Sequence, residues 1–258
     1  MDLGLEGRTA IVMAGSQGIG LACAQGFHAV GANVAICARS QGPLDVAAAT
    51  MPGCLAMIAD VTDEDDIAAF VEATQEKFGA VDILVNNAGG PPPGSFAEID
   101  DTQWAAAVEL TLMSAIRATR AVLPGMKERG WGRIVNISSF GVKQPVPNLT
   151  LSNSIRMAVL GWAKTLSNQV GPDGITVNTV CPGWTRTARV EKLFAQQSAQ
   201  SGKSEEEIEA ALVETISLRR AGEAEEIANC AVFLGSEAAS YITGAAIAVD
   251  GGVAQGYA

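Results

Sequence analysis

The sequence has few of the side chains that usually carry out acid–base or metal chemistry. It contains one histidine, two tyrosines and five cysteines in 258 residues. The cysteines are odd in number and no two form a Cys-x-x-Cys pair, which argues against a disulfide framework and against a zinc site. We therefore expect reduced thiols, no metal ion and a cytoplasmic location.

Positive charge is also scarce. Lys and Arg number 17 against 28 Asp and Glu, so the formal net charge is -11 at pH 7. Nucleic acid and anionic membrane surfaces are bound through clustered Lys and Arg, and neither partner is expected. No apolar run reaches the roughly 18 residues that span a bilayer, and residues 1–10 lack the apolar core of a signal peptide. The expected partner is a small-molecule substrate.

Short apolar strands alternate with helical patterns along the whole chain. Strands are expected at residues 9–13, 33–37, 55–58, 83–85, 133–137, 176–180 and 245–249, and helices at 18–31, 67–78, 102–129 and 153–170. Such alternation builds a parallel sheet with right-handed crossovers. The sequence predicts an α/β fold with a Rossmann-type doubly wound sheet of seven parallel strands, helices on both faces, and one domain over residues 1–258.

Residues 187–219 depart from this alternation. Three glutamates, residues 205–207, precede Ile208, Ala211, Leu212 and Ile216 at helical spacing, which indicates an inserted helical hairpin. Two interpretations stay open. The hairpin is either a solvated pair of helices packed on one side, or a mobile lid over a binding site.

A glycine-rich turn joins the first expected strand to the first expected helix. It comprises Gly15, Ser16, Gln17, Gly18, Ile19 and Gly20. Glycines allow the backbone N–H groups of such a turn to approach a pyrophosphate, and the helix dipole favours the anion. This position after the first strand is the one that dinucleotide binding requires.

Arg39 follows the second expected strand, where an NAD site usually offers an acidic side chain to the ribose 2′-OH. A guanidinium at this place suits a 2′-phosphate instead. We therefore expect a preference for NADP(H), with NAD(H) possible. The alternative is an ordinary surface arginine.

Further motifs extend the pattern to most of the chain. They are Asp60-Val61, Asn86-Asn87-Ala88-Gly89, Ile137-Ser138-Ser139, Pro182-Gly183, Tyr241-Ile242-Thr243-Gly244 and Asp250-Gly251-Gly252. With them the chain resembles the short-chain dehydrogenase/reductase family, and in particular the β-ketoacyl-carrier-protein reductases. The resemblance implies a cofactor site that includes the glycine turn, Arg39, Asp60, Val61, Asn87, Ala88, Gly89, Arg156, Pro182, Gly183, Thr185 and Thr187.

The resemblance also implies four catalytic side chains, and only one is present. Ser139 matches the serine that holds the substrate carbonyl. Ser152 stands at the position of the proton-transferring tyrosine and Arg156 at that of the lysine. Thr111 replaces the asparagine that positions a water relay. In the glycine turn, Met13 and Ala14 stand where the family usually has Thr and Gly.

Three functions are compatible with this altered site. Ser139, Ser152 and Arg156 could serve a carbonyl reductase or alcohol dehydrogenase in which Ser139 and Arg156 polarise the carbonyl and water supplies the proton. They could instead serve a non-redox reaction that needs a stabilised oxyanion, or the protein could bind a dinucleotide without catalysis. We rank the reductase first.

Two other residues are weaker candidates for the missing acid. Lys143 lies in the loop after Ser139, although a solvated lysine is the simpler interpretation. Tyr257 could reach the site of a neighbouring subunit. The expected long helices resemble subunit faces of the family, so a homo-oligomer, a tetramer or a dimer, is expected.

Overall fold

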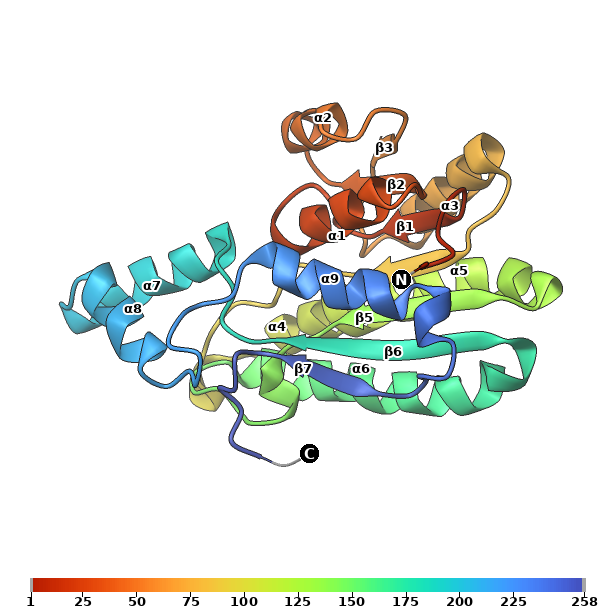
Figure 1. Cartoon of the computed structure of the whole chain (residues 1–258). Coiled ribbons are helices and arrows are strands. Elements are labelled where there is room, and N and C mark those ends of the chain that lie inside the picture. The colour runs from red at the N-terminus through yellow and green to blue at the C-terminus, as the bar shows by residue number, and fades with distance from the viewer. Residues whose placement is uncertain (1, 257–258) are drawn as a thin grey trace.

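Residues 2–256 are described by this computed structural model, and they contain one parallel sheet of seven strands. The order across the sheet is β3-β2-β1-β4-β5-β6-β7 (Figure 1). The strands are β1 (Thr9–Val12), β2 (Asn33–Ala38), β3 (Leu55–Ile58), β4 (Ile83–Asn86), β5 (Gly132–Ile137), β6 (Ile175–Pro182) and β7 (Ala246–Val249). The expected Rossmann-type doubly wound sheet is confirmed.

The central strands are buried along their whole length. Strands β1, β4, β5 and β6 consist entirely of buried residues, whereas the edge strands β3 and β7 are partly exposed. A parallel sheet covered on both faces produces such continuous apolar runs. The order reverses between β1 and β4, and ligands of open α/β sheets bind at this switch point.

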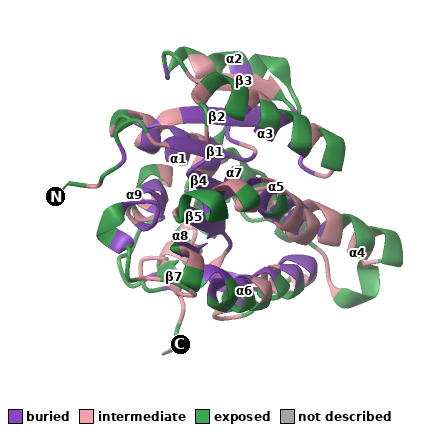
Figure 2. Cartoon of the chain, turned by 90° about the vertical axis from the view of Figure 1, so that its right-hand side faces the viewer, coloured by how far each residue is buried: buried purple, intermediate pink, exposed green. Residues whose placement is uncertain are grey.

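Helices cover both faces of the sheet (Figure 2). One face packs against α1 (Gly18–Ala29), α2 (Gln41–Ala49) and α9 (Ala224–Leu234). The opposite face packs against α3 (Glu64–Phe78), α5 (Ser114–Arg129) and α6 (Thr150–Val170). The helices α2 and α9 were not predicted, although α9 carries a helical signal in Ile227, Ala228, Ala231 and Val232, all of them buried.

The long helix predicted over residues 102–129 is interrupted. The structure has α4 (Asp101–Val108), a π-helical turn (Glu109–Met113) and then α5. In the turn the Ser114 N–H donates to the Glu109 carbonyl, five residues earlier, and the Ser114 hydroxyl donates to the Leu110 carbonyl. Residue types that form ordinary helix also form this wider turn, so apolar spacing did not reveal it. Such turns are frequent at functional sites.

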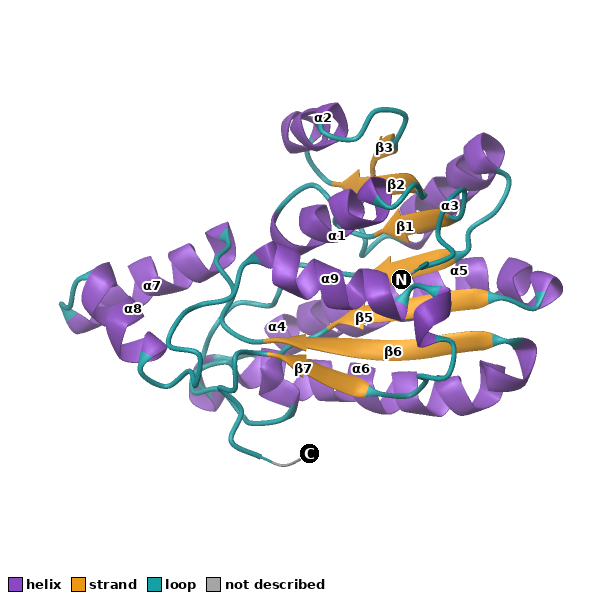
Figure 3. Ribbon diagram, in the orientation of Figure 1, coloured by secondary structure: helices purple, strands orange, loops and turns teal. Residues whose placement is uncertain are grey.

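The predicted hairpin consists of α7 (Ala188–Ser201) and α8 (Glu205–Val213). Ser204 and Glu207 form a capping box that begins α8. Both helices extend beyond the edge at which the strands end (Figure 3). Short 3₁₀ turns occur at Phe96–Glu98, Phe140–Val142, Gly171–Asp173 and Glu237–Ala239. Within residues 2–256, no helix combines the length and apolarity needed to cross a membrane.

Candidate active site

The glycine turn is held open by its backbone conformation. Ala14 has φ of 46° and Gly18 has φ of 54°, both in the left-handed region. The Asn87 side-chain amide donates to the carbonyls of Met13 and Ala14, each at 3.1 Å. A Cβ on Gly20 would lie 2.5 Å from the Asn87 amide nitrogen, so that position requires glycine. The turn therefore fits a pyrophosphate, with α1 beginning at Gly18.

A cleft of about 550 Å³ runs along the carboxyl edge of the sheet. This is the size of a typical small-molecule site. Every predicted cofactor and catalytic residue except Gly15 lines it. Gly15 is buried beneath the turn, where a Cβ would lie 2.8 Å from a methyl carbon of Ile36. The lining thus brings together residues 16–20, Arg39, Asp60, Val61, residues 87–89, Ser139, Ser152, Arg156, Pro182, Gly183, Thr185 and Thr187.

Arg39 and Asp60 lie at one end of the cleft. Asp60 accepts hydrogen bonds from the Thr62 N–H at 2.9 Å and the Thr62 hydroxyl at 2.8 Å. These bonds, the backbone one first, lower the pKa of Asp60, and the charge of Arg39 lowers it slightly further. Arg39 is exposed, and among residues 2–256 it forms no ion pair closer than 4.0 Å. Its guanidinium is therefore available to a ligand.

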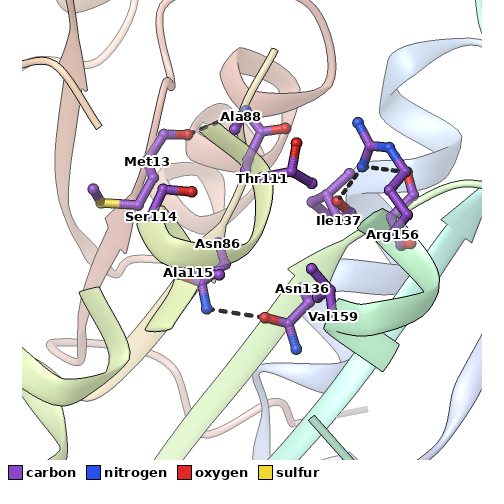
Figure 4. A pocket seen from close by; sticks show the side chains of 12 residues that line it. Met13, Asn86, Ala88, Thr111, Ser114, Ala115, Asn136, Ile137, Arg156 and Val159 are labelled. Atoms are coloured by element: carbon purple, nitrogen blue, oxygen red, sulfur yellow. Dashed lines mark hydrogen bonds between the residues drawn. The ribbon is translucent and has the colours of Figure 1, made fainter. Parts of the chain in front are cut away.

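Arg156 lies at the other end, on α6. Its Nε donates to the Ser152 hydroxyl at 3.2 Å. Its Nη1 donates to the Ile137 and Ser138 carbonyls at 3.0 Å each (Figure 4). Burial, together with the nearby charge of Arg189, lowers the pKa of Arg156 to about 10. The side chain still carries its charge at neutral pH. Its Nη2 hydrogens have no protein acceptor within residues 2–256.

Two serines follow β5 and differ in their surroundings. The Ser139 hydroxyl accepts from the Gly141 N–H at 3.1 Å, so its own O–H is left to donate into the cleft. The Ser138 hydroxyl is buried and has no hydrogen-bond partner within the described residues. Ser138 lines both the cleft and a smaller cavity behind it.

That smaller cavity has a volume of about 20 Å³ and lies between β4, β5, the π-helical turn and α6. Three buried oxygens without a partner in residues 2–256 belong to its lining residues: Asn86 Oδ1, Thr111 Oγ1 and Ser138 Oγ. Arg156 also lines it (Figure 4). A polar space of this size holds one ordered water. The sequence named Thr111 only through the family resemblance, because the π-helical turn that buries it had no sequence signal.

The helical hairpin is joined to the loop after β4 by Arg189. Its Nη1 donates to the Gly90 carbonyl at 2.8 Å and its Nη2 to the Pro91 carbonyl at 3.0 Å. A side chain at position 90 would overlap this guanidinium. Trp184 packs between Phe140 and Phe194, with ring centroids 5.7 Å and 6.5 Å apart, and so links the hairpin to the loop after β5.

Neither Lys143 nor the described tyrosine, Tyr241, lines the cleft. Tyr241 is fully exposed in the segment before β7, at the edge of the sheet opposite the cleft. Tyr257 lies outside the described residues. Burial raises the pKa of the Cys181 thiol to about 11, so it is a neutral buried group, as expected. Lys143 is half-buried near Cys181 and is absent from the cleft lining within residues 2–256.

The switch point, the glycine turn and the cleft define a dinucleotide-binding Rossmann protein. The family profile described as enoyl-(acyl carrier protein) reductase matches residues 13–254. The chain belongs to the short-chain dehydrogenase/reductase family of NAD(P)-dependent oxidoreductases.

Individual relatives match along nearly the whole chain. Oxidoreductase UcpA of Escherichia coli is 34% identical over 253 residues, which cover 96% of this chain and 95% of UcpA. L-sorbose reductase from Gluconobacter frateurii, solved with NADPH and L-sorbose, has a TM-score of 0.93 and 34% identity over 99% of this chain and 100% of its own. Actinorhodin polyketide ketoreductase, solved with NADPH, has a TM-score of 0.93 and 34% identity over 96% of this chain and 98% of its own.

Proposed function

We propose that the protein is an NADP(H)-dependent carbonyl reductase or alcohol dehydrogenase whose active site lacks the family's tyrosine and lysine. The observation that carries this proposal is the hydrogen-bonded pair of Ser152 and Arg156 on one side of the cleft that also contains Ser139 and the glycine turn. These residues occupy the positions of the missing groups. They offer N–H and O–H donors where a substrate oxygen would become negatively charged.

NADPH, held by the glycine turn and Arg39, would supply a hydride to the carbonyl carbon of the substrate, whose oxygen would then carry a negative charge. The Ser139 hydroxyl and one Nη2 hydrogen of Arg156 would stabilise that negative charge. Neither group is proposed as the acid, because the serine hydroxyl holds its proton too firmly near neutral pH and Arg156 serves as the cation that stabilises the oxygen.

A water molecule in the small cavity is the proposed source of the proton. Its position is supported by the unpartnered oxygens of Asn86, Thr111 and Ser138. Ser138 lines both spaces, so its hydroxyl can receive a proton from the water and pass its own proton toward the substrate oxygen. The hydroxide left behind is stabilised by Arg156 until solvent reprotonates it.

The proposed cofactor is NADP(H) rather than NAD(H), with NAD(H) as a weaker ligand. Two of the relatives above were solved with NADPH. In this chain Arg39 offers a cation at the end of β2 and Asp60 stays ionised beside it. A 2′-phosphate would lie against Arg39.

We also propose how the chain is organised, assembled and located. We propose one domain over residues 1–258, with α7 and α8 as a lid held by Arg189. A homo-oligomer, a tetramer or a dimer, would use the exposed faces of α5 and α6; α6 presents Met157 with 50% of its surface exposed. The expected cytoplasmic location is also retained as a proposal.

NADPH titration, followed by tryptophan fluorescence, tests the function first. Trp184 lines the cleft, so binding should change its emission, with NADPH tighter than NADH. A screen of carbonyl compounds with NADPH should then find turnover. Binding without turnover on any compound would favour a non-catalytic dinucleotide-binding protein, and the absence of binding would favour non-redox chemistry at Ser139, Ser152 and Arg156.

A further inference from the structure

We infer that the substrate of this reductase is an oxo acid whose carboxylate is bound between Arg156 and Arg189. The inference rests on the proposed function, and it adds the chemical class of the substrate. It is carried by the distribution of charge along the cleft and by the unused donors of the two guanidinium groups.

Charge is divided unevenly along the cleft. Within the described residues, Asp60 is the one carboxylate that lines it, and Asp60 lies beside Arg39 at the end where the adenine ribose is expected. The substrate end contains Arg156 and Arg189 and no acidic side chain. The phosphates of NADPH are expected at the glycine turn and at Arg39. Phosphates at those two places would not contact Arg156 or Arg189, so neither arginine would have an anion bound to it.

Within the described residues neither guanidinium has a carboxylate partner; Arg156 is half-buried and Arg189 is exposed. No carboxylate of residues 2–256 lies within 4.0 Å of either guanidinium, and their mutual repulsion contributes to the low pKa of Arg156. The nearby Asp250 is already engaged, because its oxygens accept the N–H groups of Gly252 at 2.9 Å and Ala254 at 3.0 Å. An anion placed between two like charges would relieve that repulsion.

Arg133, which is fully buried, shows how this chain neutralises a structural cation. Arg133 on β5 pairs with Glu237 at 3.3 Å and stacks on the Trp131 ring, with its guanidinium carbon 4.3 Å from the ring centroid. Buried charges in proteins are usually paired in this way. Arg156 differs from Arg133 in having only neutral oxygens as partners.

The unused donors suit a carboxylate. Arg156 has two free Nη2 hydrogens, one for the developing oxyanion and one for a carboxylate. Arg189 keeps one hydrogen on each of Nη1 and Nη2 beside its bonds to the Gly90 and Pro91 carbonyls. The Ser152 hydroxyl accepts from Arg156 and is free to donate. A carboxylate accepts two or more such bonds, and charge-assisted bonds of this kind are about twice as strong as neutral ones.

A matched set of substrates tests the inference. Oxo acids of four to eight carbons would be compared with their methyl esters in NADPH-dependent reduction. For the oxo acid that is reduced fastest, kcat/KM should exceed that of its methyl ester by about 10-fold or more. A factor of this size corresponds to the loss of one charge-assisted hydrogen bond. Equal rates, or faster reduction of the esters, would overturn the inference while leaving the reductase intact.

Variants of Arg189 separate the anion site from the lid. Arg189→Gln should lower kcat/KM for the acid about 10-fold more than for its ester, because loss of the lid contact alone would affect both equally. Arg189→Lys should restore part of the preference for the acid. The control is Lys192→Gln, which removes an exposed cation from the same helix outside the cleft and should leave the ratio unchanged.

A binding measurement tests the carboxylate site independently of turnover. Calorimetric titration of the enzyme with NADP+ present would compare butyrate and octanoate with the corresponding amides. Tighter binding of the carboxylates, lost in Arg189→Gln, supports the anion site even if no reduction is found, and in that case only the proposed function fails. Equal binding of carboxylates and amides would refute it.

Discussion

The two ends of the cleft are built from different parts of the chain. The end at the glycine turn consists mainly of backbone, fixed by left-handed φ angles and by the amide of Asn87. The substrate end consists of side chains: Ser139, Ser152, Arg156 and Arg189. A backbone cradle tolerates few changes, because a Cβ at Gly20 would overlap its neighbours. Side chains at the substrate end can be replaced without disturbing the fold, so the reaction can change while the fold and the cofactor site stay the same.

The largest effect on kcat is expected from removing the Arg156 charge at the substrate end of the cleft. Arg156→Met keeps much of the side-chain volume and removes every donor. We expect kcat to fall about 100-fold or more, the usual cost of losing a donor to a developing oxyanion. NADPH affinity should fall less than kcat does, because most of the proposed cofactor contacts lie at the untouched end of the cleft. Steady-state kinetics and fluorescence titration measure the two quantities.

Arg133→Met is the matched control, since Arg133 is buried but ion-paired away from the cleft. It should lower stability by about 2 kcal/mol, because the carbonyls of Gly132, Gly174 and Ser236 lose their donor, and it should reduce kcat little in the folded fraction. If Arg156→Met retains full activity, the proposed role of Arg156 is wrong. The pH profile adds a check. Because burial lowers the Arg156 pKa only to about 10, its contribution should be constant through neutral pH and decline only near pH 10 and above.

The next largest effect is expected on cofactor affinity, at the Arg39 end of the cleft. Arg39→Asp should weaken NADPH binding about 10-fold to 100-fold through repulsion of the 2′-phosphate, and should improve the relative affinity for NADH. Lys203→Asp makes the same change of charge at an exposed position between α7 and α8 outside the cleft. If both variants shift the ratio of NADPH to NADH affinity equally, net charge rather than a local contact sets the preference.

A smaller effect concerns the buried water. Thr111→Val keeps the side-chain shape but removes one of the cavity's polar partners. We expect kcat to fall about 10-fold, within the range for a disturbed proton transfer, and the solvent isotope effect to rise. Stability should be unchanged or higher, because a buried oxygen without a protein partner is lost.

Thr176→Val supplies the control for that change. Thr176 Oγ1 is equally buried and also lacks a partner within residues 2–256, but it lies near the start of β6, away from the cleft. This variant should leave kcat and the isotope effect as they are. A loss of activity as large as that of Thr111→Val would mean that the water site has no special role.

The same division explains what the sequence could predict. The seven strands, their parallel arrangement and the cofactor turn follow from apolar runs and glycine positions, which act locally. The pairing of Ser152 with Arg156 was also foreseeable, because residues four apart lie on one side of a helix. The clamp of Arg189 on Gly90 and Pro91 was not, since it joins segments about a hundred residues apart. The cavity beside Thr111 depends on a π-helical turn that residue types do not specify.

The smallest expected effect concerns the stability cost of the left-handed backbone conformation in the glycine turn. Ala14 is an L-residue at φ of 46°, which costs about 1 kcal/mol or more relative to a right-handed conformation. Ala14→Gly removes that cost but adds freedom to the unfolded chain, so the free energy of unfolding should rise by roughly 0.5 kcal/mol. Ala69→Gly, at an exposed interior position of α3, should lower it by about 1 kcal/mol. Urea denaturation of both variants measures the difference. If both changes destabilise equally, the turn is not strained at Ala14, and the departure from glycine there carries no cost.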